Sequence, residues 1–524
     1  MSEQADLIII GGGTAGCVLA ARLSAHTHLR VLLLEAGDKP TSPFVGIPAG
    51  FSKLFGSRCD WAFSTTPQTA AGRCIFTPRG RMLGGSSAMN AQIHQWGHPA
   101  DFDGWRDNGA AGWDWDDVSP VFRRLEKYSG EGQGRGCEGS LPAEPLASPL
   151  PQSLAFVESV RSILGTQTPS YNGAAYEGAW ISEVNHSQGR RVSAFDAWLA
   201  PAMRRPNLRV QKNTTAMSIV FEGKRATGVR VASGAGEQTL LARRGVIVSA
   251  GAFGSPHLLM CSGIGPAAHL AEMGVPVVHD APAVGSNLHD HPMACPTFTT
   301  SGKSLKSAES LSNLLNYILA RKGMLASNVA EAVAFLRSPY ADGAPDLELL
   351  FAPVEWREEG LKPPRVDGFT IAVIALTPGS RGTLKLKSRD IRTAPQIDPA
   401  LLSDSAGTDR LVMSFGLQLA RQIANTKPLS LASGDEIEPG TSCDNWEAQQ
   451  EWLNQSVQTV YHPAGTCRMG TGPDTVVSPS LAVKGVENLW IADASVMPAV
   501  TRGHPNAAVA MIAERGAEFI AAAL

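Results

Sequence analysis

The order of apolar and polar positions near the N-terminus predicts a strand, a helix and a second strand. Residues 5–10 (Ala-Asp-Leu-Ile-Ile-Ile) have the length and character of a buried strand, and so do residues 31–34 (Val-Leu-Leu-Leu). Between them lies a predicted helix whose apolar face begins at Val18, Leu19 and Leu23. Two buried strands joined by a helix are typical of a parallel βαβ unit.

The pattern changes several times along the rest of the chain. A long loop rich in proline, glycine, serine and aromatic residues covers 39–75, a loop that leads into an amphipathic helix covers 101–128, and a surface segment covers 129–150. Apolar runs between turn residues predict short strands elsewhere. We expect strands at 208–210, 218–221, 226–231, 245–248, 346–353, 369–376, 383–387 and 489–492, and helices at 153–165, 190–204, 308–321, 407–424 and 507–524.

The first and last predicted elements share one sequence pattern, and the residues between them have a different pattern. The opening strand and the closing strand, loop and helix have the pattern of a nucleotide-binding domain. The chain therefore predicts an α/β fold in which a discontinuous Rossmann-type domain is interleaved with an α+β domain built on an antiparallel sheet. The expected boundaries are 1–150, 206–295 and 441–524 for the Rossmann-type domain, and 151–205 and 296–440 for the other.

Composition narrows the class of protein. The 524 residues are 43% hydrophobic and 18% charged, and the net charge of −3 leaves no basic face for nucleic acid. The N-terminus is polar and acidic, and the apolar run after it is too short for a signal peptide or a membrane span. This predicts a cytoplasmic protein. The eight cysteines are scattered without a C-x-x-C pair, which favours reduced thiols over disulfides or zinc.

A glycine-rich turn follows the first strand and supplies the first candidate chemistry. Gly11, Gly13 and Gly16 have the G-x-G-x-x-G spacing that lets a backbone approach a pyrophosphate at a helix N-terminus. Glu35 ends the second strand 19 residues after Gly16, where an acid takes the hydroxyls of an adenosine ribose. The unit predicts a dinucleotide with a free 2′-hydroxyl, FAD or NAD, and does not choose between them.

Two further segments offer exposed backbone to a flat or charged ligand. Residues 79–90 combine two arginines, a Gly84-Gly85 pair, two serines and Asn90. Residues 251–259 form a second strand-to-helix turn with Pro256 near the start of the helix. Either segment alone is equally typical of a surface or structural turn.

Histidines in broken segments near the C-terminus are candidates for a base. His462 lies in a glycine- and proline-broken segment at 461–470, and His504 lies in Gly503-His504-Pro505-Asn506. An imidazole with a pKa near 6.5 suits the removal of a hydroxyl proton at neutral pH. The competing residues are His94, His98, His289 and His291. A metal site at His289-Asp290-His291 lacks a nearby third ligand, and no metal is expected.

These motifs together resemble the glucose–methanol–choline oxidoreductases, a family of FAD-dependent alcohol oxidases and dehydrogenases. The resemblance covers nearly the whole chain and is greatest to bacterial choline-dehydrogenase-like and alcohol-dehydrogenase-like members. Its motifs are the unit from Gly11 to Glu35, the first signature (79–90), the second signature (251–265), the segment Val284 to His291, and the C-terminal blocks around His462 and 493–514. The stretch 323–331 also supports it.

The resemblance implies FAD as the cofactor. Some members attach the flavin covalently through a histidine of the first signature, where this chain has Met89, so the FAD is expected to be noncovalent. The residues implied for FAD are Gly11, Gly13, Thr14, Ala15, Gly16, Glu35, Ala36, Arg81, Leu83, Gly84, Ser87, Asn90, Ala91, Ala216, Gly251, Asp493, Ala494, Pro505, Asn506 and Ala507.

The resemblance also implies the reaction. It predicts oxidation of a small-molecule alcohol by hydride transfer to flavin N5, with His462 as the general base, His504 as its partner, and O2 or a quinone or dye as the electron acceptor. Choline-type members have Asn at position 504, so the histidine here makes choline itself a poor candidate. Glu331 and Tyr461 are expected to line the substrate site, where Glu331 either pairs a cation or only braces a loop. A hydroxynitrile-lyase-type reaction on the same fold is the alternative.

Overall fold

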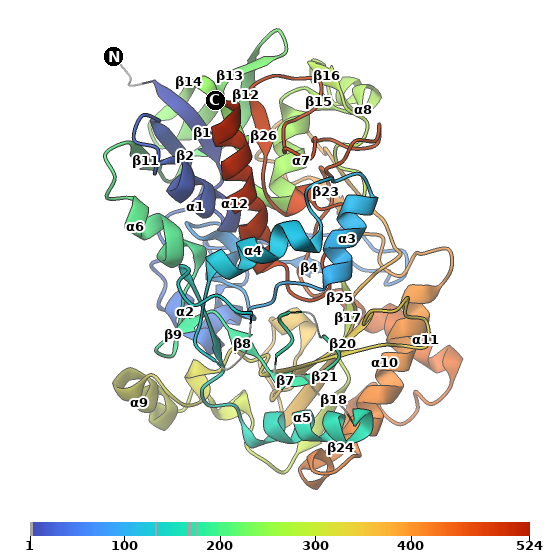
Figure 1. Cartoon of the computed structure of the whole chain (residues 1–524). Coiled ribbons are helices and arrows are strands. Elements are labelled where there is room, and N and C mark those ends of the chain that lie inside the picture. Colours follow the sequence, from blue (N-terminus) through green and yellow to red (C-terminus); the bar gives the residue numbers. More distant parts are fainter. Residues whose placement is uncertain (1–3, 131–133, 166–169, 174–175) are drawn as a thin grey trace.

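The computed structural model describes residues 4–130, 134–165, 170–173 and 176–524. Its two largest sheets lie one above the other in Figure 1, with the two ends of the chain in the upper layer and the middle of the chain in the lower layer. The fold is mixed α/β with an antiparallel second sheet, as the sequence predicted.

The upper sheet has seven strands and contains the predicted βαβ unit. Its strands are β1 (Ala5–Ile10), β2 (Val31–Leu34), β11 (Leu208–Gln211), β12 (Thr215–Glu222), β13 (Arg225–Ser233), β14 (Gly236–Val248) and β26 (Leu489–Ile491). The order is β11-β2-β1-β14-β13-β12, and β26 also pairs with β14. β11, β2, β1 and β26 run parallel to the end of β14.

β14 is longer than the strand predicted at 245–248 because it belongs to two patterns. From Gly236 to Leu241 it pairs antiparallel with β13, and from Ala242 to Val248 it pairs parallel with β1. The apolar run identified the buried end of the strand, whereas residues 236–239 are exposed and carry no such signal.

Helices from both ends of the chain pack together beside this sheet. α1 (Thr14–Leu23) and α12 (Asn506–Ala523) lie side by side (Figure 1), and Arg22 on α1 donates to Glu514 on α12 at 2.7 Å. α4 (Trp115–Leu125) packs on α12, and α7 (Gly251–Cys261) packs against β12. The apolar faces of these helices and the upper sheet form one continuous core.

The lower sheet has eight strands, all paired antiparallel. They are β7 (Gly178–Ile181), β17 (Pro292–Ala294), β18 (Thr297–Thr300), β19 (Ala332–Leu336), β20 (Leu347–Ala352), β21 (Gly368–Ala375), β24 (Ser433–Glu438) and β25 (Gln458–Thr459). The main order is β24-β18-β21-β20-β19-β7, and β17 joins β21 to β25. β17 and β25 fall in ranges expected for the Rossmann-type domain, and the domain boundaries stay a prediction.

At its centre the lower sheet is apolar on both faces, which explains the mainly apolar sequences of β19, β20 and β21. On β20, Leu347, Leu349 and Phe351 pack toward α5 (Pro151–Leu164) and α10 (Thr408–Ala424). Because side chains alternate along a strand, Glu348 points to the opposite face with its neighbours 350 and 352. That second face borders the cavity described below.

Three predicted segments differ from the structure. The helix expected at 190–204 begins only at Phe195, because Ser193 and Asp196 pair through two hydrogen bonds in the manner of a helix cap. Its first residues form β10 (Arg190–Arg191), and its end is α6 (Ala200–Ala202). The range 101–128 contains most of α3 (Pro99–Asp107) as well as α4, and 129–150 contains β6 (Leu141–Pro145), which pairs with β5 (Glu126–Tyr128) and β8 (Glu183–Val184).

The remaining elements are short and lie around the two layers. They are α2 (Pro43–Gly46), α8 (Ala267–Glu272), α9 (Leu311–Ala320), α11 (Trp446–Ser456), β3 (Phe63–Ser64), β4 (Phe76–Thr77), β9 (His186–Ser187), β15 (Ile264–Gly265), β16 (His279–Asp280), β22 (Thr383–Lys385) and β23 (Gln396–Asp398).

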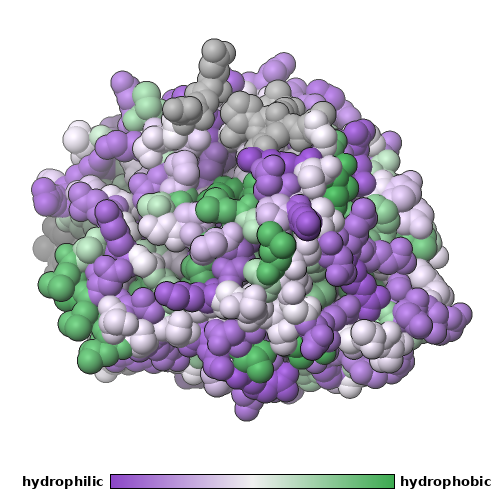
Figure 2. Space-filling model, turned by 90° about the horizontal axis from the view of Figure 1, so that it is seen from below, coloured by the Kyte–Doolittle hydropathy of each residue, from purple (hydrophilic) through white to green (hydrophobic). Residues whose placement is uncertain are grey.

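α9 stands out from the rest of the surface. It projects from the lower layer in Figure 1, and the view from below in Figure 2 shows hydrophobic residues gathered at that edge of the molecule. Among the described residues, no helix combines the length and the hydropathy needed to cross a membrane.

Candidate active site

A cavity of about 670 Å³ lies between the two layers. One end is bordered by the glycine-rich turn after β1 and by the end of β2. The other end is bordered by His462 and His504 from the C-terminal part of the chain and by β20 and β21 of the lower sheet. The cavity therefore connects the candidate nucleotide site with the candidate base.

The glycines of the turn have two different physical roles. A Cβ atom on Gly16 would lie 1.8 Å from the carbonyl oxygen of Gly11, so this glycine allows α1 to pack closely on the strand end. A Cβ atom on Gly13 would approach only Gly85, at 4.0 Å, and Gly13 lines the cavity. The open space at Gly13 is where a pyrophosphate fits against the helix N-terminus.

Glu35 is held rigidly at the end of β2. Its Oε2 accepts a hydrogen bond from the backbone N–H of Gly12 at 2.8 Å, and its Oε1 accepts from Gly37 at 2.8 Å. Burial raises the pKa of Glu35 to about 7, although both hydrogen bonds act to lower it. The carboxylate lines the cavity with lone pairs to spare, so it fits the hydroxyls of a ribose.

Two helices direct their N-termini at the same part of the cavity. Thr14 begins α1 and Asn506 begins α12, and the hydroxyl of Thr14 donates to the side-chain oxygen of Asn506 at 2.9 Å. Both residues line the cavity. The positive ends of two helix dipoles thus converge where an anionic cofactor would lie.

Asp493 acts as a brace in the cavity wall. It accepts hydrogen bonds from Ser255 Oγ at 2.5 Å, from the N–H of Gly251 at 2.9 Å and from the N–H of Ser495 at 2.8 Å. Burial raises the pKa of its carboxyl, and these hydrogen bonds oppose that shift. Asp493 therefore fixes the N-terminus of α7 while it borders the cavity.

The structure brings most of the predicted cofactor residues to the cavity wall. Those that line it are Gly11, Gly13, Thr14, Ala15, Glu35, Ala36, Arg81, Asn90, Ala91, Ala216, Gly251, Asp493, Ala494, Pro505 and Asn506. The others lie behind the wall, and their contact with the cofactor stays a prediction. Gly16 and Ala507 pack within helices, Leu83 is fully buried, the N–H of Gly84 donates to Gly12, and Ser87 bonds to Gly84 and Ala194.

The candidate residues did not include an aromatic part of the wall. Phe51, Phe55, Trp61 and Phe63 come from the long loop at 39–75, and Phe253 comes from α7. Phe63 and Phe253 meet edge to face at 5.7 Å, and the Arg81 guanidinium lies 4.9 Å from the Trp61 ring. The aromatic richness of a long loop was the available signal, because such rings suit the faces of flat ligands.

His462 and His504 meet at the end of the cavity nearest the lower sheet. Their ring centroids are 4.8 Å apart and the rings are nearly perpendicular, at 88°. His462 Nδ1 also lies 3.2 Å from Nδ1 of the buried His291, and the backbone N–H of His462 donates to Asp290 at 2.8 Å. The ring of His462 is therefore fixed on one side, and its other edge faces the cavity.

His504 is fixed by a carboxylate from the lower sheet. Its Nε2 lies 2.9 Å from Oε1 of Glu348, and its backbone N–H donates to Gln95 at 2.9 Å. Glu348 is only 1% exposed, and its second oxygen has no hydrogen-bond partner within the described part of the chain. Sequence reasoning missed Glu348 because an isolated acid in an apolar strand carries no motif.

Burial favours the neutral form of His462 and His291. It lowers the pKa of His462 well below the ordinary value, and the charges of His504, His291 and Arg79 add to that effect. Burial and His504 likewise lower the pKa of His291 to about 3. His462 is thus a free base at neutral pH.

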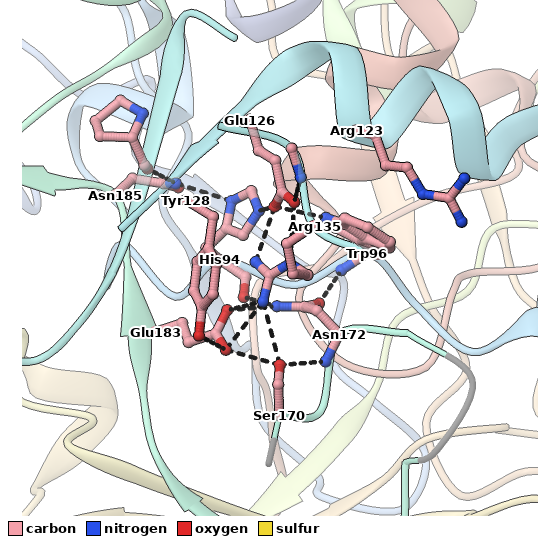
Figure 3. A network of polar contacts seen from close by, with 12 residues as sticks. His94, Trp96, Arg123, Glu126, Tyr128, Arg135, Ser170, Asn172, Glu183 and Asn185 are labelled. Carbon is pink, nitrogen blue, oxygen red and sulfur yellow. Dashed lines mark hydrogen bonds and ion pairs between the residues drawn. The ribbon is translucent and has the colours of Figure 1, made fainter. Parts of the chain in front are cut away.

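His94 belongs to a structural network and not to the cavity (Figure 3). Its Nε2 lies 3.0 Å from Glu126, and Arg135 joins Glu126 to Glu183 through contacts of 2.8 and 2.9 Å. Burial acts to raise the pKa of Glu126, but the hydrogen bonds from His94 and Arg135 outweigh it and lower the pKa to about 2. Trp96 donates to the same carboxylate at 3.1 Å.

The other two competing histidines are also occupied by structural contacts. His98 caps α3 by accepting the N–H of Ala100 at 3.1 Å. His289 accepts the N–H of Val500 on Nε2 at 2.8 Å, so its Nδ1 carries the proton and donates to the carbonyl of Asn287 at 2.6 Å. Neither residue lines the cavity, and both are corrected as candidates for the base.

The structure places Glu331 among donors of the protein itself, in the manner of a loop brace. Its Oε1 accepts from Ser327 at 2.6 Å, and its Oε2 accepts from Ser153 and from the backbone of Leu150, each at 2.7 Å. The side chain is fully buried and does not border the cavity. Tyr461 does line the cavity, and its hydroxyl donates to the carbonyl of Glu359 at 3.0 Å.

Comparisons with known proteins agree on one family. The model of the GMC oxidoreductases matches residues 5–293 with its N-terminal part and residues 378–513 with its C-terminal part. The chain is 42% identical to an uncharacterized GMC-type oxidoreductase of Mycobacterium tuberculosis, over 99% of this chain and 100% of that protein. It is 37% identical to an alcohol dehydrogenase (acceptor) of Pseudomonas putida, over 98% of this chain and 95% of that protein. The crystal structure of pyridoxine 4-oxidase from Mesorbium loti superposes with a TM-score of 0.89 and 33% identity, over 98% of this chain and 99% of that chain.

Proposed function

Because the chain belongs to the GMC oxidoreductase family, we propose that it oxidises the CH–OH group of an alcohol to an aldehyde or ketone. Its cofactor is FAD. The observation that carries the proposal is the cavity itself, which has a dinucleotide site at one end and a neutral histidine beside a second histidine at the other. Met89 lines the cavity, and its thioether cannot form the histidyl link to flavin, which supports noncovalent attachment.

FAD, when bound, supplies the acceptor for the hydride that leaves the α-carbon of the alcohol. His462 takes the hydroxyl proton on Nε2, so the alcohol loses one proton and one hydride and becomes a carbonyl compound. This role requires that His462 carry its own proton on Nδ1, from which it donates to Nδ1 of His291 at 3.2 Å. His291 then holds the ring in place and accepts from the imidazolium that forms.

His504 supplies the second polar contact for the substrate oxygen. Glu348 takes the Nε2 side of the ring, so His504 reaches the substrate oxygen through Nδ1. Because the single hydroxyl proton goes to His462, this contact requires a proton on Nδ1 of His504, from which the ring donates. The perpendicular packing on His462 fixes the angle between the two rings. Fixed geometry of this kind raises the rate of reaction, because even a small displacement of the reacting groups slows the chemical step.

The lining near the two histidines supports an uncharged substrate with an apolar or aromatic body. Leu350, Ala352 and Val460 border this end of the cavity. Among the described lining residues, the only carboxylates are Glu35 and Asp493, at the dinucleotide end. A cationic alcohol would therefore find no carboxylate on the described cavity lining near the histidines.

The decisive experiment is anaerobic mixing of the purified flavoprotein with uncharged aromatic and aliphatic primary alcohols, with choline as the charged comparison. We expect the visible flavin band to bleach with an uncharged alcohol, and the return of colour in air to distinguish O2 from a quinone or dye as the acceptor. A protein that bleaches with no alcohol yet cleaves a cyanohydrin would overturn the proposal in favour of the lyase reaction.

A further inference from the structure

The amphipathic pattern of α9 is inverted relative to an ordinary surface helix. Its apolar residues have the i, i+3, i+4 spacing of a single stripe, and that stripe faces outward. An ordinary surface helix buries such a stripe in the core. The exposed fractions are 71% for Leu311, 39% for Leu314, 49% for Leu315, 58% for Ile318 and 83% for Leu319.

The opposite face of α9 attaches the helix to the protein. Tyr317 is 1% exposed, and its hydroxyl lies 3.1 Å from the carbonyl oxygens of both Gly46 and Gly189. Asn313 donates to the carbonyl of Ser307 at 2.9 Å. The polar face is therefore used for docking onto the protein, and this fixes the apolar stripe toward solvent.

The segments that flank α9 are basic. Lys303 and Lys306 precede the helix and Arg321 and Lys322 follow it, and all four are exposed. The acid within 303–322 is Glu309, which is paired with Lys53 at 2.7 Å. This concentration of positive charge is local, because the whole chain has 45 basic and 48 acidic residues.

We propose that the apolar stripe of α9 and its four basic flanking residues form a surface that docks on an anionic lipid membrane. We call these nine residues the α9 surface. A helix that lies in the membrane interface buries an apolar face among the acyl chains and places basic residues beside anionic headgroups. The α9 surface has both components in that arrangement.

The shape of the α9 surface favours a membrane over a second copy of the chain. α9 projects from the body of the protein (Figure 1), so its apolar stripe forms a ridge one helix wide. A stable protein interface buries roughly 800 Å² on each partner with complementary packing, which a single ten-residue helix does not offer. Four exposed cations around the ridge would also repel their symmetry mates.

The α9 surface is coupled to the cavity through one apolar cluster. Tyr317 packs in a cluster that also contains Leu150, Leu305 and Leu325, with Val329 packed against it. Val329 lines the cavity. Docking would therefore hold a wall of the cavity near the lipid, where apolar alcohols and quinones dissolve.

The test is cosedimentation of the holoprotein with vesicles. One set is phosphatidylcholine alone, and the other contains about one third phosphatidylglycerol in place of phosphatidylcholine. The variants are Leu315→Ser with Leu319→Ser for the stripe, and Lys306→Glu with Lys322→Glu for the charge. The matched controls are Leu241→Ser with Leu431→Ser, which are 50% and 72% exposed, and Lys385→Glu with Lys387→Glu on an exposed strand end. Flavin absorbance of each variant reports folding.

We expect the parent and both controls to bind the anionic vesicles, and binding to weaken in high salt. The affinity of each α9 variant for the anionic vesicles should fall at least about tenfold. The stripe variant loses buried CH₂ groups, and the charge variant loses attraction to the headgroups. Binding of neither vesicle by the parent would overturn the proposal. A second result would also overturn it. If the parent binds no vesicles but forms a concentration-dependent dimer, and only the stripe variant abolishes that dimer, the ridge is an interface with a second copy of the chain. Alcohol oxidation in solution is independent of either outcome.

Discussion

Oε1 of Glu348 lies 2.9 Å from Nε2 of His504, so a carboxylate of the lower sheet holds a histidine that arrives from the C-terminal part of the chain. The contact joins the two layers at the point where the substrate would lie. Glu348 does not line the cavity itself, and its effect must pass through His504. Glu348 is therefore a positioning residue.

Replacing Glu348 with glutamine should lower the rate of flavin reduction about tenfold to hundredfold, because the His504 ring loses its charged acceptor and moves. The measurement is the anaerobic reductive half-reaction in the parent, in Glu348→Gln, in His504→Asn and in the double variant. Since Glu348 acts through His504, the two substitutions should be non-additive. Additive losses would assign Glu348 a merely structural role. Glu355→Gln removes another buried carboxylate outside the site and serves as the matched control.

The His462→Ala variant should retain FAD and reduce it about 10²- to 10⁴-fold more slowly, because the alcohol proton loses its acceptor. Rapid mixing under anaerobic conditions measures the rate, and the flavin spectrum reports occupancy. His289→Ala is a useful comparison, because that histidine is buried next to the same segment but does not line the cavity. A near-parental rate in His462→Ala would remove His462 from the mechanism.

The rate of flavin reduction should hold its value as the pH falls through 6.5, the pKa of an unperturbed histidine. Burial lowers the pKa of His462 well below that value, so its unprotonated, active form persists into more acidic solution. The measurement is anaerobic flavin reduction across that pH range, and a loss of rate with a midpoint at 6.5 would contradict the lowered pKa of His462.

Two glycine substitutions should separate cofactor binding from folding. In Gly13→Ala the new methyl group enters open cavity, so the protein should fold normally and bind FAD more weakly. In Gly16→Ala the methyl group would meet a backbone oxygen at 1.8 Å, so the protein itself should be destabilised. FAD titration and urea unfolding of the two apoproteins measure the difference. Equal stability of both variants would contradict the close packing at Gly16.

The Arg135→Met substitution should lower the free energy of unfolding by about 3–5 kcal/mol, because it leaves two buried carboxylates without their cation. Glu126 and Glu183 are 0% and 6% exposed at the side chain. The midpoint of urea unfolding measures the effect. The exposed pair of Arg392 and Asp390 provides the control, and Arg392→Met should leave the midpoint unchanged.

Most of the fold was predictable because its elements repeat a short-range pattern. The unit from Ala5 to Glu35 has a buried strand, a glycine turn, a helix and an acid in fixed order, and each part has a direct physical cause. In the lower sheet β20 and β21 were recognisable as apolar runs, whereas its other strands were not predicted. The helix expected at 190–204 was wrong for residues 190–194. The hydrogen bond between Ser193 and Asp196 marks the start of the helix, and the spacing of apolar residues does not contain that signal.

The candidate site was predictable only where its residues lie in motifs. His462 and His504 lie in broken polar segments and were identified, whereas Glu348 sits alone in an apolar strand, 156 residues from its partner His504. Glu331 was expected at the substrate because of its sequence position, but three donors within the protein occupy its carboxylate. Such pairings depend on tertiary contacts that the local pattern does not contain.

The contact of α1 with α12 constrains the order of events during synthesis. Thr14 and Asn506 lie 492 positions apart, yet together they border the cavity beside the glycine turn. A ribosome releases the N-terminal strand and its turn long before α12 emerges, so the partial chain has an open pocket with one wall missing. Flavin loading is therefore a late step, and nascent chains arrested before residue 506 should not retain FAD.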